Sequence, residues 1–438
     1  MNQSPKNPSF RQDLLSKGVF AALTLGCLLA PSWRVPVQAA MEDSPKAVID
    51  EVWQIVNNEF VDKNFNQVDW QKTRQELLSR NYASQQEAYQ AIRQALKRLD
   101  DHYTRFLDPK EFESLTSQTS GEVSGVGIRF KLDEQTHELT VVEPLENSPA
   151  SQAGIRTGDK ILRINGKPTS LMTIEQASEE IRGKVGTRVS LEISRPGRKG
   201  IFQVTLTRAQ IELPSLSYTI KDESQMRVGY IKLDEFSSHA AEQMKQAIKD
   251  LNDKQASAFV LDLRGNPGGL LLASVDIARM WMDKGAIVQT VDRKGGDRRF
   301  SANGTSLTDR PLVVLVDENS ASASEILAAA LQENKRATLV GTRTFGKGTV
   351  QSVHSLTDGS GLAVTIARYY PPDGVSINKK GVAPDISQEL TIEDQFRLRS
   401  NPSLFATVAD PQYAKAIAVL KTIHLGQTNP SRQPISIR

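Results

Sequence analysis

The chain has 438 residues, of which 39% are apolar and 24% are charged, so it is long enough to bury two or three separate cores. Its formal charge is only +3, and its single cysteine and five histidines form no HExxH pattern and no Cys/His cluster. This composition excludes a disulfide scaffold, argues against nucleic acid as a partner, and predicts neither a metal site nor a cofactor.

The first 39 residues have the pattern of a secretory signal peptide. Basic residues precede an apolar run over 19–30, and residues 37–39 (VQA) offer a cleavage site. The run is too short to span a membrane, and Cys27 lies in a poor context for lipid attachment, so a membrane or lipid anchor is the weaker alternative. We therefore expect an exported protein whose mature chain begins near Ala40.

Changes in pattern divide the mature chain into four parts. Apolar residues at helical spacing predict an N-terminal helical domain over 40–115. Short alternating segments with glycine and proline predict a compact β-rich module over 116–210. Strands that alternate with helices predict an α/β core with a largely parallel sheet over 211–390, and 391–438 reads as a polar tail with one packing helix.

One segment offers a candidate nucleophile. Residues 317–326 (DENSASASEI) follow an apolar strand and open a helix, and such a turn exposes side chains and backbone N–H groups. A serine attacks a carbonyl only when a base removes its proton. Ser322 is therefore a candidate, but Ser322 followed by Glu325 is also a helix-capping box, which is the commoner role.

A second segment offers a candidate base. Residues 344–351 (TFGKGTVQ) place Lys347 between glycines that allow close backbone approach. A desolvated lysine loses its proton more readily and can act as a neutral base for a serine. Gln351 can hold the amine by a hydrogen bond. The alternatives are a solvated loop lysine and an ordinary polar strand residue.

A third segment offers an anion site. Residues 262–269 (DLRGNPGG) end a buried strand in a glycine-rich turn whose free N–H groups can receive an oxyanion or a phosphate. A phosphate is disfavoured because neither the GxGxxG nor the Walker pattern is present. A tight turn that uses glycine for positive φ is the alternative.

The β-rich module resembles a PDZ domain in residues 148–155 (SPASQAGI) and 158–166 (GDKILRING). PDZ domains add a free chain terminus as a strand to a sheet edge, and loop N–H groups receive its carboxylate. The candidate loop contains Gly125, Val126, Gly127 and Ile128, although a simple strand start is also possible there.

Taken together, residues 266–269, 322–326 and 345–348 resemble the motifs of the carboxyl-terminal processing peptidases, also called tail-specific proteases. The similarity runs from about residue 44 to 386, and the 25-residue spacing from Ser322 to Lys347 suits the family's serine-lysine dyad. The resemblance implies that Ser322 is the nucleophile and Lys347 the base, that Gln351 assists Lys347, and that Gly268 and Ala323 donate oxyanion N–H groups.

The resemblance also implies a serine endopeptidase that acts on proteins with a free carboxyl terminus. The family includes the enzyme that trims the photosystem II D1 precursor, so the expected compartment is the periplasm or the thylakoid lumen. An inactive PDZ adaptor and a thioester hydrolase are the rival classes. A histidine base, His102 or His354, has no supporting motif, and Glu333, where some relatives have an aspartate, is expected to be structural.

Overall fold

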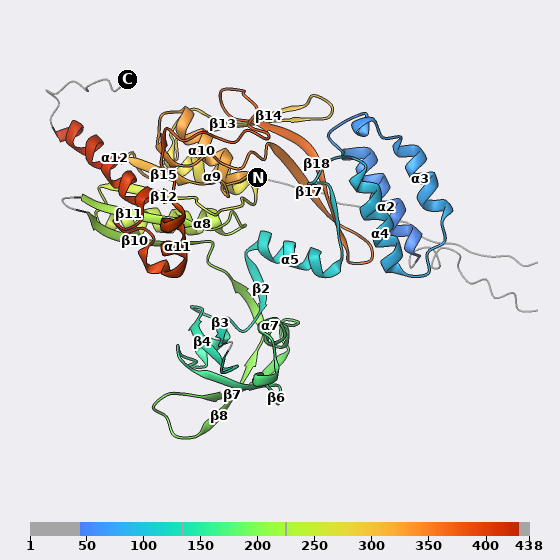
Figure 1. The fold of residues 1–438 in the computed structure, drawn as a ribbon, viewed down its shortest axis with the longest axis horizontal. Coiled ribbons are helices and arrows are strands. Elements are labelled where there is room, and N and C mark those ends of the chain that lie inside the picture. Colours follow the sequence, from blue (N-terminus) through green and yellow to red (C-terminus); the bar gives the residue numbers. More distant parts are fainter. Residues whose placement is uncertain (1–43, 134, 224–225, 429–438) are drawn as a thin grey trace, which may run out of the picture. The chain divides into compact units, whose positions relative to one another are not determined.

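The computed structural model describes residues 44–133, 135–223 and 226–428. The predicted signal peptide and Cys27 lie outside the described residues. The chain is a multidomain α/β protein, as predicted, with helices first, then a β-rich module, then a core on a mixed, mostly parallel sheet (Figure 1). Among the described helices, none has the length and apolarity needed to cross a membrane.

The N-terminal helices meet in one apolar core. They are α2 (Pro45–Glu59), the 3-10 turn η1 (Phe65–Gln67), α3 (Trp70–Ser79) and α4 (Gln85–Lys97). Trp53 Nε1 donates to the Trp70 carbonyl at 2.8 Å, and Trp70 Nε1 donates to the Trp53 carbonyl at 3.2 Å, so the two indoles join α2 to α3. Leu356, Leu362 and Val364 complete this core. The helices therefore share their core with a sheet from the C-terminal half of the chain.

The segment after α4 leaves the helical core. It forms β1 (Arg105–Leu107) and α5 (Pro109–Ser120). Asp108 and Glu111 form a capping box at the start of α5, and Gly121, with φ 71°, ends it. The helix thus runs past Leu115, where the sequence pattern placed the end of the helical part. Residues 116–120 are all polar, so no periodic pattern of apolar residues indicates that the helix continues to Ser120.

The β-rich module is an antiparallel sheet of order β3-β4-β5-β7-β8, with β6 attached to β5. Its elements are β3 (Ile128–Leu132), β4 (Leu139–Pro144), α6 (Pro149–Gln152), β5 (Lys160–Ile164), β6 (Lys167–Pro168), η2 (Thr169–Leu171), α7 (Ile174–Ile181), β7 (Arg188–Ser194) and β8 (Ile201–Thr207). It has its own core, in which Leu139, Ile161 and Leu191 are buried. The ladder of β2 (Glu122–Gly125) and β9 (Ala209–Glu212) leads the chain into and out of the module. Because β3 is an edge strand, it can accept a further strand.

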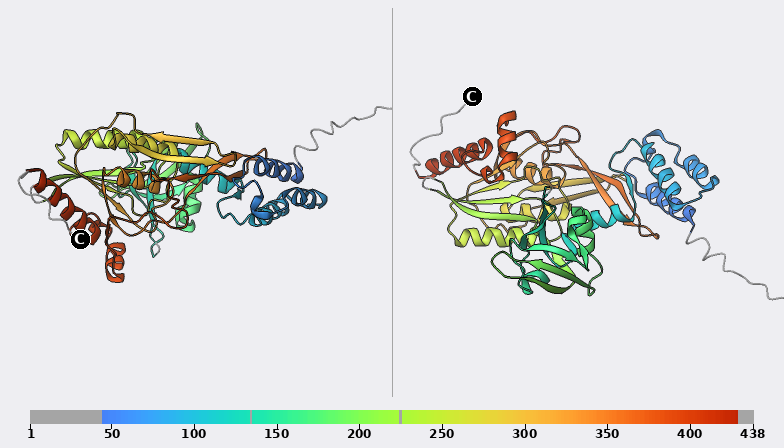
Figure 2. Two further views of the ribbon diagram at one scale, coloured as in Figure 1. Left: turned by 90° about the horizontal axis from the view of Figure 1, so that it is seen from above. Right: turned by 60° about the horizontal axis from the view of Figure 1, so that its bottom comes forward.

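A six-stranded sheet of order β10-β11-β12-β15-β16-β19 lies at the centre of the core, and only the β10–β11 pair is antiparallel. Its elements and covering helices are β10 (Leu216–Glu223), β11 (Met226–Leu233), α8 (Ala240–Asp253), β12 (Ala258–Asp262), α9 (Leu271–Trp281), β15 (Leu312–Val316), α10 (Ala323–Glu333), β16 (Thr338–Gly341), β19 (Ile386–Ser387) and α12 (Pro411–Thr428). Helices α8, α9 and α10 cover one face, and α12 covers the other (Figure 2). The carboxyl ends of β12, β15 and β16 share one edge, where the residues that follow them meet.

A second sheet combines distant segments. It contains β13 (Ala286–Asp292), β14 (Asp297–Ser301), β17 (Thr349–Ser355) and β18 (Gly361–Tyr370), and β1 pairs with β18 at its edge. The β13–β14 hairpin was not predicted. Its strands carry arginine and aspartate on exposed faces, so the apolar alternation that identifies a strand is weak there.

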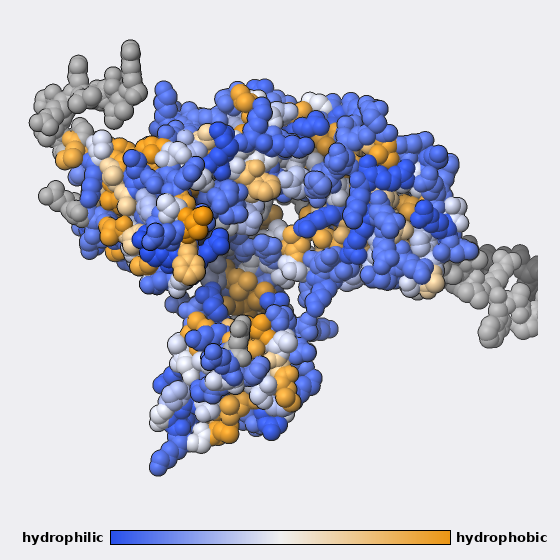
Figure 3. All heavy atoms as spheres, in the orientation of Figure 1, coloured by the Kyte–Doolittle hydropathy of each residue, from blue (hydrophilic) through white to orange (hydrophobic). Residues whose placement is uncertain are grey.

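The C-terminal segment, defined here as residues 391–428, is more structured than a polar tail. It contains α11 (Ile392–Ser400), η3 (Pro402–Leu404) and α12. Tyr413, Ile417 and Leu420 on α12 are buried against the central sheet. Apolar surface gathers over α11 and α12 (Figure 3), where Ile392 and Phe396 are 87% and 73% exposed. The sequence predicted only one of the two helices, because α11 has no buried apolar face long enough to give a periodic pattern.

Candidate active site

Ser322 lies in the turn between β15 and α10 and has an uncommon backbone conformation. Its φ is 55° and its ψ is −113°, a region that non-glycine residues adopt only when their surroundings enforce it. The Ser322 carbonyl accepts the N–H groups of Glu325 at 2.9 Å and Ile326 at 3.0 Å, which start the helix. The residue is half-buried and lines a cleft. The geometry therefore fits a nucleophile on a sharp strand-to-helix turn.

Glu325 connects the serine segment to the lysine segment. Its carboxylate is fully buried and accepts four hydrogen bonds: Ser322 N and Lys347 N at 2.9 Å each, Gly346 N at 2.7 Å and Thr344 Oγ1 at 2.6 Å. Burial raises the pKa of Glu325, and the four donors oppose that rise. The sequence identified Glu325 only as a capping residue, because its partners follow 19 to 22 residues later.

Tyr369 makes a second connection between the two segments. Its hydroxyl donates to the Lys347 carbonyl and lies 3.2 Å from the Ser322 carbonyl. Tyr369 comes from β18 and is buried, so its position follows from the second sheet. No short-range pattern in the sequence marks this residue. Glu325 and Tyr369 together fix the backbone of both predicted catalytic residues.

The Lys347 ammonium nitrogen lies 4.7 Å from the centroid of the Tyr103 ring. Burial lowers the pKa of Lys347, the positive charge of Arg105 lowers it further, and Asp101 and Glu325 oppose the shift. Within the described part of the chain, no hydrogen bond or ion pair holds Lys347 Nζ, and none joins it to Ser322. A lysine without a paired carboxylate and with a lowered pKa suits a neutral base.

Gln351 lines the same cleft, but among the described residues no hydrogen bond joins its side chain to Lys347. Its amide nitrogen donates to Thr349 Oγ1 at 2.9 Å and approaches Thr365 Oγ1 at 3.3 Å. The side chain is therefore held on the β17–β18 pair, and its expected help to Lys347 requires a change of rotamer.

The turn after β12 lies directly against the serine. Asn266 O accepts Ala321 N at 3.0 Å and Ser324 Oγ at 2.9 Å. The N–H of Gly268, expected to bind an oxyanion, donates instead to Asn266 Oδ1 at 2.9 Å. Among the described residues, the N–H of Ala323 has no acceptor. The structure thus brings Gly268 and Ala323 together beside Ser322, with Ala323 free to donate and Gly268 engaged.

Substitution of Gly268 with alanine is expected to lower kcat at least about 100-fold, as loss of an oxyanion donor does. The added Cβ would lie 2.7 Å from the Ala321 carbonyl oxygen and 2.9 Å from Ser322 Cβ, and φ is 106°. Gly265 in the same turn is the control, because φ is 71° but a Cβ there meets no atom within 4 Å. Gly265→Ala should cost about 1–2 kcal/mol of stability and keep most activity. Equal losses of kcat in the two variants would contradict this prediction.

All five residues predicted for catalysis line one cleft of about 550 Å³. Its apolar wall contains Phe236, Leu271, Ile326 and Val350. Tyr103, just before β1, and Arg105, the first residue of β1, also line it, although the sequence placed these residues only at the end of the helical part. They were missed because their proximity depends on the pairing of β1 with β18.

Among the described residues, neither alternative base forms a hydrogen bond with Ser322. His354 Nε2 lies 2.9 Å from Glu59 Oε2 on α2. His102 lines the cleft, but no hydrogen bond joins it to Ser322 in the described structure. Glu333 accepts the backbone N–H of Asp373 at 2.7 Å and does not line the cleft. This contact fits the structural role expected for Glu333.

The predicted tail-binding loop lies between β2 and β3. Gly125 ends β2 and Ile128 begins β3. The Val126 carbonyl accepts Ala150 N at 3.0 Å, and Gly127 has φ 72°. Within the described residues, the N–H groups of Val126 and Gly127 have no acceptor. Two free N–H groups beside an edge strand are the arrangement that a peptide carboxylate requires.

Comparisons with known proteins show the family and the PDZ domain. The family model for peptidase family S41 matches residues 227–388, and a PDZ domain model matches residues 140–195. The chain is 40% identical over 402 residues to a carboxyl-terminal-processing protease from Synechocystis sp., which covers 91% of this chain and 92% of that protein. It is 39% identical over 365 residues to carboxyl-terminal-processing peptidase 3, chloroplastic, from Arabidopsis thaliana, covering 80% and 70%.

A solved structure named photosystem II D1 C-terminal processing protease is also similar. It has a TM-score of 0.53 and 34% identity, and the match covers 84% of this chain and 99% of that one. A putative S41 protease from Bacteroides fragilis, at 17% identity and a TM-score of 0.52, shares the fold.

Proposed function

The chain belongs to the carboxyl-terminal-processing serine proteases of peptidase family S41, with a PDZ domain, and we propose that Ser322 and Lys347 form its catalytic dyad. The observation that carries this proposal is the pair of connections from Glu325 and Tyr369 to both residues. Four contacts from these two side chains to the backbone of Ser322 and Lys347 hold the two residues in a fixed relative position. A serine and a base must be held in this way to act together.

In the proposed reaction, neutral Lys347 takes the proton of the Ser322 hydroxyl as its oxygen attacks the peptide carbonyl. The developing oxyanion is stabilised by the Ala323 N–H and, once released from Asn266, by the Gly268 N–H. Lys347 then gives its proton to the leaving amine, and water hydrolyses the acyl-enzyme. Gln351 turns from β17 to hold the Lys347 amine.

The pH dependence of this reaction gives a test of the Lys347 environment. Activity should fall as the pH drops through the pKa of Lys347, because the protonated amine cannot accept a proton. Arg105→Gln removes a positive neighbour, so the pKa of Lys347 should rise and the acidic limb of kcat against pH should move to higher pH. Arg105→Lys keeps the charge and should leave the limb in place. A limb that moves equally in both variants would refute this electrostatic role.

Recognition of the substrate tail is proposed to occur at the edge of β3. The tail adds as an antiparallel strand, and the Val126 and Gly127 N–H groups, with Gly125 and Ile128 beside them, receive its carboxylate. Tethering raises the effective concentration of the chain near Ser322, so the terminus contributes more to specificity than the bond that is cut.

Tail recognition is tested with one unfolded reporter that carries either a free or an amidated carboxyl terminus. We expect kcat/KM for the free form to exceed that for the amide at least about 10-fold, since a charged hydrogen-bonded pair contributes about 1.5–3 kcal/mol. The difference should shrink when Val126 alone is replaced by proline, which has no N–H to donate, whereas Gly127, with φ 72°, cannot adopt the backbone angle of proline. Equal rates on the two reporters in the wild-type protein would count against tail recognition.

We further propose that the natural substrates are exported proteins in the periplasm or thylakoid lumen, with the photosystem II D1 precursor among them. The name of the similar solved structure and the chloroplastic relatives support this proposal. A reporter ending in the carboxyl-terminal tail of that precursor should be cleaved faster than one with an unrelated free tail. Equal rates would leave general tail-specific proteolysis as the function.

A further inference from the structure

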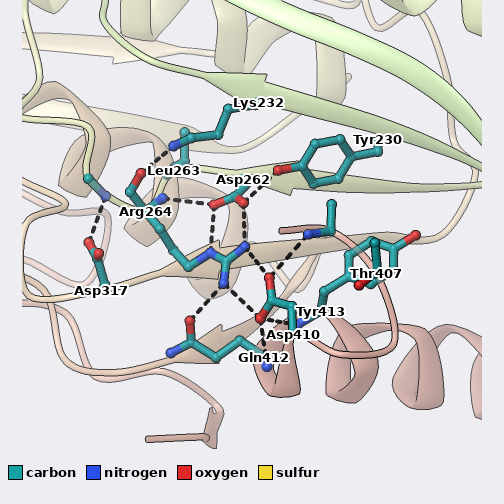
Figure 4. A network of polar contacts seen from close by, with 12 residues as sticks. Tyr230, Lys232, Asp262, Leu263, Arg264, Asp317, Thr407, Asp410, Gln412 and Tyr413 are labelled. Carbon is teal, nitrogen blue, oxygen red and sulfur yellow. Dashed lines mark hydrogen bonds and ion pairs between the residues drawn. The ribbon is translucent and has the colours of Figure 1, made fainter. Parts of the chain in front are cut away.

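Arg264, the second residue after β12, is the centre of a buried polar network (Figure 4). Its guanidinium donates to Asp262 at 2.9 and 2.6 Å, to Asp410 at 3.1 and 2.8 Å, and to Gln412 Oε1 at 2.9 Å. All five of its N–H donors therefore have an acceptor. Arg264 is 7% exposed, Asp262 1% and Asp410 0%, so this network is shielded from water.

Asp410 links this network to the C-terminal segment. It precedes α12, and its carboxylate also accepts the N–H groups of Gln412 at 3.1 Å, Tyr413 at 3.3 Å and Ala406 at 3.3 Å. One carboxylate thus starts α12 and provides two of the five acceptors of Arg264. Two of the residues in this network, Asp262 and Arg264, belong to the core, whereas Asp410 and Gln412 come from almost 150 residues later.

Arg264 opens the same turn that lies against Ser322. Gly265 N donates to Asp317 Oδ1 at 2.9 Å, ahead of the serine, and Asn266 O accepts Ala321 N at 3.0 Å. Gly268 follows two residues after Asn266 and lies so near the serine that a Cβ added to it would be 2.9 Å from Ser322 Cβ. A displacement of Arg264 would therefore also move Gly265, Asn266 and Gly268, whose hydrogen bonds set the position of the turn beside Ser322.

The network is also electrically balanced. Burial raises the pKa of Asp262, but the charge and hydrogen bonds of Arg264 lower it more, to about 2. Tyr230 Oη donates to Asp262 Oδ2 at 2.8 Å, and Lys232 Nζ donates to the Arg264 carbonyl. Removing the charge of Asp410 leaves a buried guanidinium with unpaired donors, which must then move or admit water.

We propose that Asp410 is a positioning residue for catalysis: the C-terminal segment holds Arg264, and through it the turn 264–269, in the place that the oxyanion requires. The proposal rests on the proposed function of Ser322 and that turn. It assigns to the C-terminal segment a role in the reaction beyond covering the central sheet.

The test compares Asp410→Asn with two control variants that weaken the attachment of the same segment elsewhere. Lys221 Nζ donates to the Ala406 carbonyl at 2.6 Å, and Tyr413 Oη donates to Glu223 Oε1 at 3.0 Å. Among the described residues, neither side chain forms a hydrogen bond with Arg264, so Lys221→Met and Tyr413→Phe should lower Tm with kcat nearly unchanged. Asp410→Asn should lower kcat on the free-ended reporter about 100-fold with KM nearly unchanged. All rates are taken well below the lowest Tm.

If kcat follows Tm in the same way in all three variants, or if Asp410→Asn keeps its activity, Asp410 is merely structural and the proposal is overturned. Should Asp410→Asn fail to fold, Gln412→Met removes a single acceptor of Arg264 together with the bond to the Gln388 carbonyl, and it should lower both kcat and Tm by less than Asp410→Asn does. An unchanged kcat in that variant would also overturn it.

A second readout does not depend on activity. In the Ser322→Ala background, hydrogen exchange of the peptide covering 262–270 should be faster with Asp410→Asn than without it, and unchanged with Lys221→Met. This readout needs no turnover, so it tests the positioning role separately from the proposed function. Failure of the proposed function would instead appear as a wild-type protein that does not cleave the reporter. Equal exchange with and without Asp410→Asn would contradict the proposal.

Discussion

Replacement of Lys347 with methionine is expected to lower kcat for reporter cleavage at least about 10⁴-fold, as loss of a dyad or triad member does in serine hydrolases. Methionine fills a similar volume but cannot take the Ser322 proton. Its thioether can pack on the Tyr103 ring, which the lysine now faces at 4.7 Å, so the fold should be retained. Steady-state cleavage rates, with Tm as the check on folding, measure the effect.

Lys379 provides the matched control. Its backbone N–H donates to the Gly346 carbonyl at 2.7 Å, so it lies beside the same loop, but its side chain is exposed. Lys379→Met should therefore keep kcat within about twofold, as surface substitutions have small effects. A Lys347→Met protein that cleaves nearly as fast as wild type would show that another group is the base.

The second large effect is expected from Glu325→Gln. The amide offers one acceptor oxygen in place of two, so its NH₂ group must face either the N–H groups of Ser322 and Lys347 or the hydroxyl of Thr344 and the N–H of Gly346. Each buried donor left without a partner costs about 1–3 kcal/mol. We expect Tm to fall clearly and kcat to fall about 100-fold, because both catalytic segments lose their common support.

Glu333→Gln, at the other end of α10, is the control for this substitution. Its carboxylate accepts one backbone N–H at 2.7 Å, which a glutamine oxygen can also accept. Its activity should remain near that of wild type. If Glu325→Gln keeps kcat while its Tm falls, Glu325 supports the fold alone and the proposed link between the two segments is wrong.

Much of the site could be predicted because its chemistry lies in short motifs. Three neighbouring parallel strands of the central sheet, β12, β15 and β16, are followed by the turn 262–269, Ser322 and Lys347 in that order. Because parallel strands end at the same edge of a sheet, these segments meet there. The capping pattern of Ser322 and Glu325 was correct as far as local structure goes. Its second role was hidden because hydrogen bonds to residues 344–347 depend on how the turns after β15 and β16 pack.

The missed residues share one physical reason. Tyr103, Arg105 and Tyr369 reach the cleft only because β1 and β17 both pair with β18, an arrangement that joins segments more than 200 residues apart. Asp410 reaches Arg264 only because α12 packs on the central sheet. Each contact depends on long-range pairing, for which the local pattern of apolar and polar residues carries no information.

The most direct test of the central claim is cleavage of one unfolded, free-ended reporter by the purified protein beginning at Ala40 and by its Ser322→Ala variant. We predict turnover by the wild-type protein and, at equal Tm, a loss of at least about 10⁴-fold in the variant. Comparable cleavage by both proteins would contradict the assignment of Ser322 as nucleophile, and with it the catalytic dyad.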